Sequence, residues 1–186
     1  IPAERIRIFQ APLTASKEDM SNLNRKKAPE LIREYFLEQL NPDILLITSL
    51  FEDGENAVTS IGKLSKNIKT AVVLYDLIPL LQSDIYLTSK TQQNYYYDKI
   101  ESLKNADLWL AISESSKQEG VTALSLLKSE VFNISTAVGD QFESIDLHDH
   151  QKIEIFDRYG IKRKIIMYAP GGFDPRKNFD RLIKAY

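Results

Sequence analysis

Short apolar runs alternate along this chain with longer segments of helical periodicity. This alternation is typical of a parallel β-sheet whose strands are connected by helices. The apolar residues of Ile44–Thr48 are consecutive, as expected when helices cover both faces of a strand. The predicted strands are Ile44–Thr48, Thr70–Leu74, Asp107–Ile112, Val131–Ile134 and, farther along, Lys164–Tyr168, with Ile6–Phe9 as a further candidate. The sequence therefore predicts an α/β fold with a doubly wound, Rossmann-like parallel sheet.

Segments of helical periodicity lie between the predicted strands. In Ala28–Leu40 the apolar residues share one helix face, and Asn41-Pro42 ends the segment because proline cannot continue the backbone hydrogen bonds of a helix. Gly160 is a candidate for the left-handed C-terminal cap of another helix. The predicted helices are Ala28–Leu40, Glu55–Leu64, Ser89–Asn105, a helix from Ser113 or Ser115 to about Leu127, Lys152–Tyr159 and Asn178–Tyr186.

The sequence changes character after Val138. The following residues are polar and rich in acidic side chains, which predicts a connector. We therefore predict a Rossmann-like domain over residues 1–138, a linker over 139–163 and the beginning of a second domain over 164–186. The chain begins without a methionine and ends within a predicted helix, so we expect the sequence to be a fragment of a longer protein.

The composition excludes several classes of protein. The 24 basic and 26 acidic residues give a net charge of −2, without the basic excess expected of a nucleic-acid-binding protein. The chain has no cysteine, so disulfides and thiolate metal sites are excluded. No apolar run approaches the roughly 20 residues of a membrane-spanning helix. His148 and His150 flank Asp149, but the chain has no third histidine, and we predict no metal site.

A glycine-rich segment follows the predicted strand Lys164–Tyr168. Gly171 and Gly172 allow the backbone to approach a ligand closely. Arg176 and Lys177 place two positive charges at the start of the next helix, whose free N–H groups also attract anions. Together these features favour a site for a diphosphate group. The alternative is an ordinary strand-to-helix turn, because such turns often have this composition.

Four segments of the chain together resemble the group 1 glycosyltransferases, a family of retaining enzymes with the GT-B fold. They occur in the order and spacing of that family and cover nearly all of the chain from Asn41 onward. The segments are Asn41–Gly54, Leu74–Leu80, Ala106–Lys117 and Tyr168–Tyr186. The resemblance is greatest to bacterial enzymes of surface-polysaccharide synthesis, many of which are mannosyltransferases.

The resemblance implies transfer of a sugar, with mannose as a candidate, from a nucleotide diphosphate sugar to a hydroxyl group of a glycan. It assigns Lys177 to the donor diphosphate, assisted by Arg176, and we expect Gly171 and Gly172 of the same loop to approach that group. Fixed positive charges there would stabilise the negative charge that develops on the leaving diphosphate. We expect no cofactor apart from this donor substrate. Many relatives have an arginine where this chain has Gly172.

Polar residues after the first two predicted strands of the sheet are candidates for the acceptor side of the site. Asp76 follows a buried strand, so we predict that it lies in the crevice as the catalytic candidate; capping of the following turn is the open alternative. Tyr75 stands where relatives have a histidine, and it can form a hydrogen bond but is a poor proton acceptor. Ser49 and Glu52 follow Ile44–Thr48, and we expect them on the acceptor side.

The resemblance also implies partners and a location. The expected partners are a nucleotide sugar and a glycan or lipid-linked acceptor, with no nucleic acid. The expected location is the cytoplasm, and peripheral binding at the inner face of the plasma membrane is compatible with it. We expect the fragment itself to be inactive, because the acidic pair of the family's donor site would lie beyond Tyr186.

Two alternatives to this function were compared. A Rossmann oxidoreductase would need a Gly-x-Gly-x-x-Gly turn, which Gly171-Gly172 does not supply. A non-catalytic GT-B-like module for assembly or acceptor docking within a larger protein stays open, because Tyr75 and Gly172 depart from the family pattern.

Overall fold

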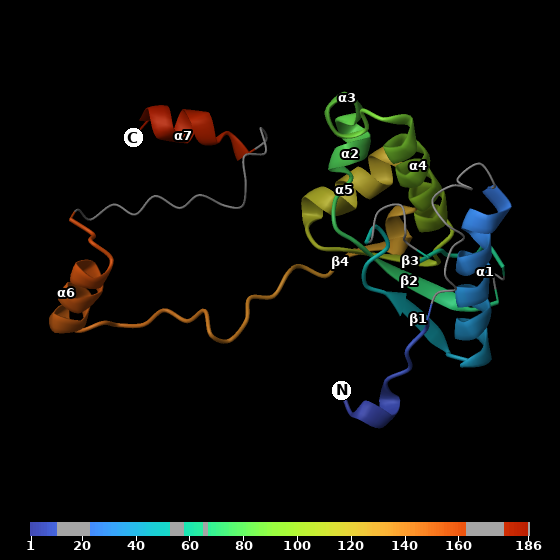
Figure 1. Cartoon of the computed structure of the whole chain (residues 1–186), viewed down its shortest axis with the longest axis horizontal. Helices are drawn as coiled ribbons and strands as arrows, with labels where there is room; N and C mark the ends of the chain where they lie inside the picture. The colour runs from blue at the N-terminus through green and yellow to red at the C-terminus, as the bar shows by residue number, and fades with distance from the viewer. Residues whose placement is uncertain (11–22, 53–57, 65–66, 163–176, 186) are drawn as a thin grey trace. The chain divides into compact units, whose positions relative to one another are not determined.

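The computed structural model describes residues 1–10, 23–52, 58–64, 67–162 and 177–185 (Figure 1). The contacts divide the chain into two compact units, Ile1–Ala137 and Val138–Tyr186. Several predicted features lie outside the described residues: the strand Lys164–Tyr168, the first residues of the helix Glu55–Leu64, and Gly171, Gly172 and Arg176.

The first unit is built on a parallel sheet. Its strands are β1 (Ile44–Ile47), β2 (Lys69–Leu74), β3 (Leu108–Ala111) and β4 (Val131–Asn133), and they lie in the order β1-β2-β3-β4. All three pairings are parallel, and Val72 of β2 lies beside both Ile47 and Trp109. The predicted α/β class with a Rossmann-like parallel sheet is confirmed. The four described strands have the same order in the sheet as in the chain. They therefore do not include the point at which the strand order of a doubly wound sheet reverses.

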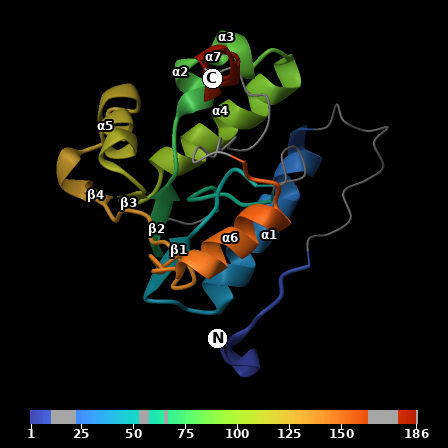
Figure 2. The same ribbon diagram turned by 90° about the vertical axis from the view of Figure 1, so that its left-hand side faces the viewer.

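In this unit a 3₁₀ turn and a helix precede β1, and further helices connect β2 to β3 and β3 to β4. The helices are α1 (Leu23–Gln39), α2 (Ile78–Leu81), α3 (Ser83–Tyr86), α4 (Lys90–Lys104) and α5 (Glu114–Ala123), with 3₁₀ turns at Ala3–Arg5 and Lys128–Glu130. In Figures 1 and 2, α4 and α5 lie together on one side of the sheet. This is expected, because right-handed connections between parallel strands that are neighbours in chain order place their helices on the same face. The Ser89 side chain accepts a hydrogen bond from the backbone of Gln92, whose side chain accepts one from Ser89 N. This capping box explains why α4 begins where it was predicted.

The core lies between the sheet and its helices. One apolar cluster contains Ile47, Val72, Leu74, Trp109, Ala111 and Val131 from the strands and Tyr96, Ile100 and Leu103 from α4. The three residues of α4 share one side of the helix, because they are spaced by three and four positions. Each fully buried apolar side chain of this size stabilises the folded state by about 1.5–3 kcal/mol, because its surface is removed from water.

The opposite face of the sheet is apolar and exposed. Successive residues of a strand point to opposite faces, so Leu46 and Phe132 point away from the core. Both residues are 51% exposed. Because α4 and α5 cover the other face, the expectation that helices cover both faces of the strands is not met by the described residues.

Four segments of the first unit differ from the prediction. Residues 58–64 are irregular rather than helical, with Gly62 at a φ of 68°, and contacts from α1 and α4 hold them. Ile6–Phe9 forms no strand. The helix after Ser113 ends at Ala123 instead of about Leu127, and α1 begins five residues before the predicted start at Ala28.

The second unit contains two described helices, α6 (Asp149–Arg158) and α7 (Phe179–Ala185). α6 begins before the predicted start at Lys152, because the Gln151 side chain accepts a hydrogen bond from His148 N at 2.9 Å and closes the first turn. Gly160 has a φ of 63°, which confirms the predicted left-handed cap. In the described part of the chain, no helix has the length and apolar character needed to cross a membrane.

We expect Asp107→Asn to lower the stability of the first unit in a pH-dependent way. The carboxylate accepts hydrogen bonds from Thr70 N at 2.9 Å and Lys69 Nζ at 3.0 Å, which ties β2 to β3. The backbone bond from Thr70 is the main cause that holds the pKa of Asp107 below its ordinary value. Burial opposes it, and the hydrogen bond and charge of Lys69 lower the pKa further. The stabilisation is therefore present above the ordinary pKa and is lost as the pH falls below it.

Urea unfolding of Asp107→Asn should show a loss of about 1 kcal/mol at pH 7, since the lysine contact is exposed and screened. The difference from the unaltered protein should shrink as the pH falls from about 5 toward 2. Asp43→Asn, at an exposed position before β1, is the control and should change little. An Asp107→Asn effect that does not vary with pH would contradict this explanation.

Candidate functional site

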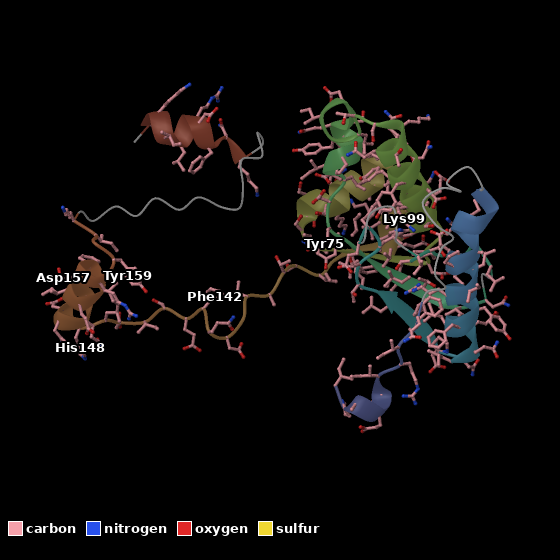
Figure 3. The ribbon with its side chains drawn as sticks, in the orientation of Figure 1. Tyr75, Lys99, Phe142, His148, Asp157 and Tyr159 are labelled. Carbon is pink, nitrogen blue, oxygen red and sulfur yellow. The ribbon has the colours of Figure 1, made fainter. Side chains whose placement is uncertain are left out.

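The carboxyl ends of β1, β2 and β3 lie along one edge of the sheet, because these strands are parallel. Ser49 and Glu52 follow β1, Tyr75 and Asp76 follow β2, and Ser113 follows β3. We refer to these five residues as the carboxyl edge. Tyr75 lies at the margin of the first unit (Figure 3) and is 52% exposed. The chain thus places its predicted acceptor-side residues at one edge of the sheet.

Asp76 lies in the turn between β2 and α2. Its Oδ1 accepts a hydrogen bond from Ile78 N at 3.0 Å, so the capping contact weighed as an alternative is present. The residue is also exposed. A carboxylate has two oxygens and about four acceptor positions, so one bond to the backbone leaves capacity for hydroxyl donors of a ligand.

Two residues of α5 anchor this turn. Ser116 Oγ donates to the carbonyl oxygen of Tyr75, and Glu119 Oε2 accepts from Leu77 N at 3.1 Å. Leu77 is fully buried, which fixes the turn from its other side. No local sequence pattern indicates these roles of Ser116 and Glu119, because their partners lie about forty residues earlier in the chain. The turn that carries Tyr75 and Asp76 is therefore held by α5.

The tyrosines of α4 pack largely as core residues. Tyr96 is 7% exposed and its ring lies 5.2 Å from that of Phe51, whereas Tyr97 is 44% exposed. Burial raises the pKa of Tyr96 well above its ordinary value, and the negative charges of Asp76 and Glu119 raise it further. The phenol therefore stays neutral at physiological pH and does not act as a base.

The residues after β1 are held against α4. Leu50 is 2% exposed, and the hydroxyl of Tyr95 donates to the carbonyl oxygen of Glu52 at 3.4 Å. Ser49 is half-buried and Glu52 is exposed. Glu52 can therefore meet a ligand from solvent while its backbone is fixed.

Ser113 caps the start of α5, one of the two predicted starts of this helix. Its Oγ accepts a hydrogen bond from Ser116 N at 3.0 Å. Glu114 Oε2 is 3.4 Å from Asn133 Nδ2, a contact between α5 and the end of β4. These contacts give Ser113 and Glu114 structural roles at the carboxyl edge.

The residues predicted for the donor diphosphate belong to the second unit. Lys177 is exposed and lies two residues before α7, separated from the helix by Asn178, which has a φ of 53°. Gly171, Gly172 and Arg176 fall outside the described residues. The structure thus describes all five residues of the carboxyl edge. Of the four residues predicted to bind the donor diphosphate, it describes Lys177.

The two histidines of the connector lie at the start of α6. Their rings stack with centroids 5.8 Å apart, and His148 precedes the helix that begins at Asp149. Searching the described residues for three or more grouped His, Cys, Asp or Glu side chains finds no set that could hold a metal ion. Hydrogen bonding at the start of α6 accounts for the position of His148.

Comparison with known proteins relates the chain to mannosyltransferases. It is 33% identical over 180 residues to the serotype-specific mannosyltransferase WbdA of Escherichia coli, and two further sequences of that name match at 33% and 32%. The match covers 96% of this chain, whereas the chain spans about a fifth of the length of these relatives. The chain is therefore homologous to one part of a mannosyltransferase.

Two other comparisons add nothing to this relation. No protein-family model matches the chain, and no solved structure matches it.

Proposed function

We propose that the chain is part of a retaining glycosyltransferase with the GT-B fold that takes part in polysaccharide biosynthesis. The enzyme transfers a sugar, with mannose as the first candidate, from a nucleotide diphosphate sugar to a glycan or lipid-linked acceptor. The observation that carries this proposal is the 33% identity to WbdA across 96% of the chain. The chain alone is inactive in this proposal, because it corresponds to only about a fifth of the length of these mannosyltransferases.

The acceptor side of the site is assigned to the carboxyl edge. Exposed side chains at the ends of parallel strands are where α/β sheets bind ligands. Asp76, Tyr75 and Glu52 offer oxygen atoms that can accept hydrogen bonds from sugar hydroxyls, and all three are exposed. Ser49 adds a hydroxyl group beside them. Asp76 is the catalytic candidate in this assignment, since its carboxylate can orient the reacting hydroxyl or carry its proton.

The donor side is assigned to the start of the second domain, over residues 164–186. Gly171, Gly172, Arg176 and Lys177 would bind the donor diphosphate, and the exposed ammonium of Lys177 is the described part of this group. Positive charge near a departing diphosphate stabilises the transition state more than the ground state, because the negative charge on the diphosphate increases as the bond breaks. Residues 139–163 form the linker and residues 1–138 the acceptor domain of this arrangement.

The proposed acceptor suggests a place for the protein in the cell. Nucleotide sugars are cytoplasmic substrates, and a lipid-linked acceptor would bring the enzyme to the inner face of the plasma membrane as a peripheral protein. The net charge of −2 gives no reason to add a nucleic-acid partner.

A second candidate is a non-catalytic module that docks the acceptor within a larger protein. The observation in its favour is the pair of residues, Tyr75 and Gly172, that replace the histidine and arginine of the resembled family. Such a module would use the carboxyl edge for glycan binding without any use of a nucleotide sugar.

Calorimetric titration with nucleotide sugars separates the two candidates. The protein as its gene encodes it is titrated with GDP-mannose and, separately, with a UDP-sugar. The transferase proposal predicts that one of them binds and that Lys177→Ala weakens this binding at least about 10-fold, because an ammonium–diphosphate contact is lost.

The matched control is Lys184→Ala, which removes an exposed lysine from the last turn of α7. Its affinity should stay within about 2-fold of the unaltered protein. Failure of the unaltered protein to bind any nucleotide sugar would contradict the transferase proposal and favour the module.

A further inference from the structure

Lys99 is a buried lysine in the middle of α4. Its side chain is 2% exposed, and it lies within the body of the first unit (Figure 3). Its ammonium donates to Glu30 Oε1 of α1 and to the carbonyl oxygen of Thr59, both at 2.6 Å. Burying a charge is costly unless close partners compensate for the lost water, so a buried lysine with two such contacts has a specific structural task.

Glu30 joins Lys99 to a second lysine. Its other carboxylate oxygen lies 2.6 Å from Lys63 Nζ, which also lies 2.7 Å from Asp98. We refer to Glu30, Lys63, Asp98 and Lys99 as the ion cluster. Its members come from α1, α4 and the segment after β1, so the cluster ties three parts of the chain together.

The segment held by this cluster is 58–64, the returning part of the connection between β1 and β2. Besides the bond from Lys99 to Thr59, the carboxylate of Glu34 accepts from the Ser60 hydroxyl and from Leu64 N at 2.6 Å. Asn105 Nδ2 donates to the carbonyl oxygen of Ile61 at 3.0 Å. This part of the connection is therefore fixed by side chains of α1 and α4 rather than by its own secondary structure.

α4 also holds the outgoing part of the same connection, residues 48–52. Tyr95 donates to Glu52 O, and the ring of Tyr96 packs on Phe51. Lys99 lies three and four positions after these tyrosines, hence on the same side of the helix, and its ammonium is 5.9 Å from the centre of the Tyr95 ring. One side of α4 thus contacts both ends of the connection between β1 and β2.

We propose that Lys99 is a positioning residue for acceptor recognition. By holding Thr59 and contacting the Tyr95 ring, it fixes both ends of the connection that carries Ser49 and Glu52 at the carboxyl edge. This role rests on the proposed function, because Ser49 and Glu52 contact a sugar acceptor only if that function is correct. Lys99 itself touches no substrate and acts through the backbone of the connection.

Hydrogen exchange tests the structural part of the proposal on the chain itself. Lys99→Met should accelerate amide exchange at 48–52 and 58–64 by about 10-fold or more, while amides of β2 and β3 stay within about 2-fold. Lys104→Met, which alters an exposed lysine on the same helix, should leave all of these rates within about 2-fold. Equal acceleration throughout the unit would overturn the proposal, because Lys99 would then support the fold in general.

A second variant covers the case in which Lys99→Met folds poorly. The double variant Glu30→Gln, Lys99→Met removes both charges of the pair, and Lys63 keeps its contact with Asp98. It should show the same local acceleration at 58–64. Exchange at 58–64 equal to that of the unaltered chain would overturn the proposal.

Steady-state transfer assays test the functional part on the protein as its gene encodes it, with GDP-mannose as donor and a mannotriose as acceptor. Lys99→Met should raise the acceptor KM by about 10-fold and leave the donor KM and kcat within about 2-fold, because uniform acceptor binding is lost. A fall in kcat without a change in acceptor KM would overturn the positioning role alone. Absence of transfer by the unaltered protein would overturn the proposed function, and the positioning role with it.

Discussion

Glu30→Ala is expected to lower the free energy of unfolding by about 3–5 kcal/mol, because it leaves buried lysine charge without its carboxylate. Glu30 is 5% exposed and lies 2.6 Å from both Lys99 and Lys63. The Lys99 side chain is only 2% exposed, so bulk water has little access to replace the lost carboxylate. Urea unfolding followed by circular dichroism measures the difference.

The control for this prediction is Glu101→Ala on α4. The Glu101 side chain is 72% exposed and pairs with Lys104 at 3.3 Å on the helix surface. Its loss should cost less than about 0.5 kcal/mol, since surface ion pairs are screened by water. The apolar double variant Glu30→Leu, Lys99→Met should recover much of the stability lost in Glu30→Ala, because no buried charge of that pair is left. Equal costs for Glu30→Ala and Glu101→Ala would contradict the account of the ion cluster.

Trp109→Ala is expected to lower the free energy of unfolding by about 3–5 kcal/mol, which is the range for removing a large aromatic side chain from a core. Trp109 is 5% exposed and lies in the centre of the sheet, paired with Val72 on one side and Val131 on the other. Its indole nitrogen donates to the carbonyl oxygen of Leu103 at 2.8 Å, near the end of α4. The residue therefore joins the sheet to α4 by packing and by a hydrogen bond.

Trp109→Phe separates these two contributions. It keeps most of the ring area and loses the bond to Leu103, so it should cost about 1–2 kcal/mol for the carbonyl left without this donor. Urea unfolding followed by far-ultraviolet circular dichroism serves for all variants, because the chain has one tryptophan and the variants lack its fluorescence. The packing account would be wrong if Trp109→Phe were as costly as Trp109→Ala.

The sheet and its principal helices follow from local sequence. The runs at Ile44–Thr48 and Thr70–Leu74 are short and consecutive in apolar residues, and each became a strand within one residue of its predicted bounds. α4 lies within one residue of the predicted bounds Ser89–Asn105. Tyr96, Ile100 and Leu103 repeat with helical spacing there, and the structure shows in addition that Ser89 caps the helix. Local sequence patterns were sufficient to predict these elements, because the local preference and the tertiary packing favour the same structure there.

The segment 58–64 could not be predicted in this way. Val58, Ile61 and Leu64 repeat every three residues, which favours a helix, but the segment is irregular. Its conformation depends on Glu34 and Lys99, which lie about thirty to forty residues away in sequence. Contacts of this range override a weak local preference.

The candidate site was partly accessible from sequence. Asp76 and Ser49 were identified because they directly follow predicted strands, and the structure places both at the carboxyl edge. Glu119 was missed because a glutamate within a helix is usually solvated, and its bond to Leu77 N becomes visible only when α5 packs against the end of β2. Lys99 was missed for the same reason, since burial of a lysine has no sequence signal.

The central claim is that the carboxyl edge binds a sugar acceptor, and a nuclear magnetic resonance titration of the isotope-labelled chain with mannotriose tests it most directly. The account predicts amide shifts at Ser49, Glu52, Tyr75, Asp76 and Ser113 that saturate together. It predicts no shifts at the opposite edge of the sheet, where Asp43, Lys69 and Asp107 lie. Shifts confined to that opposite edge, or no shift at any residue up to millimolar mannotriose, would contradict it.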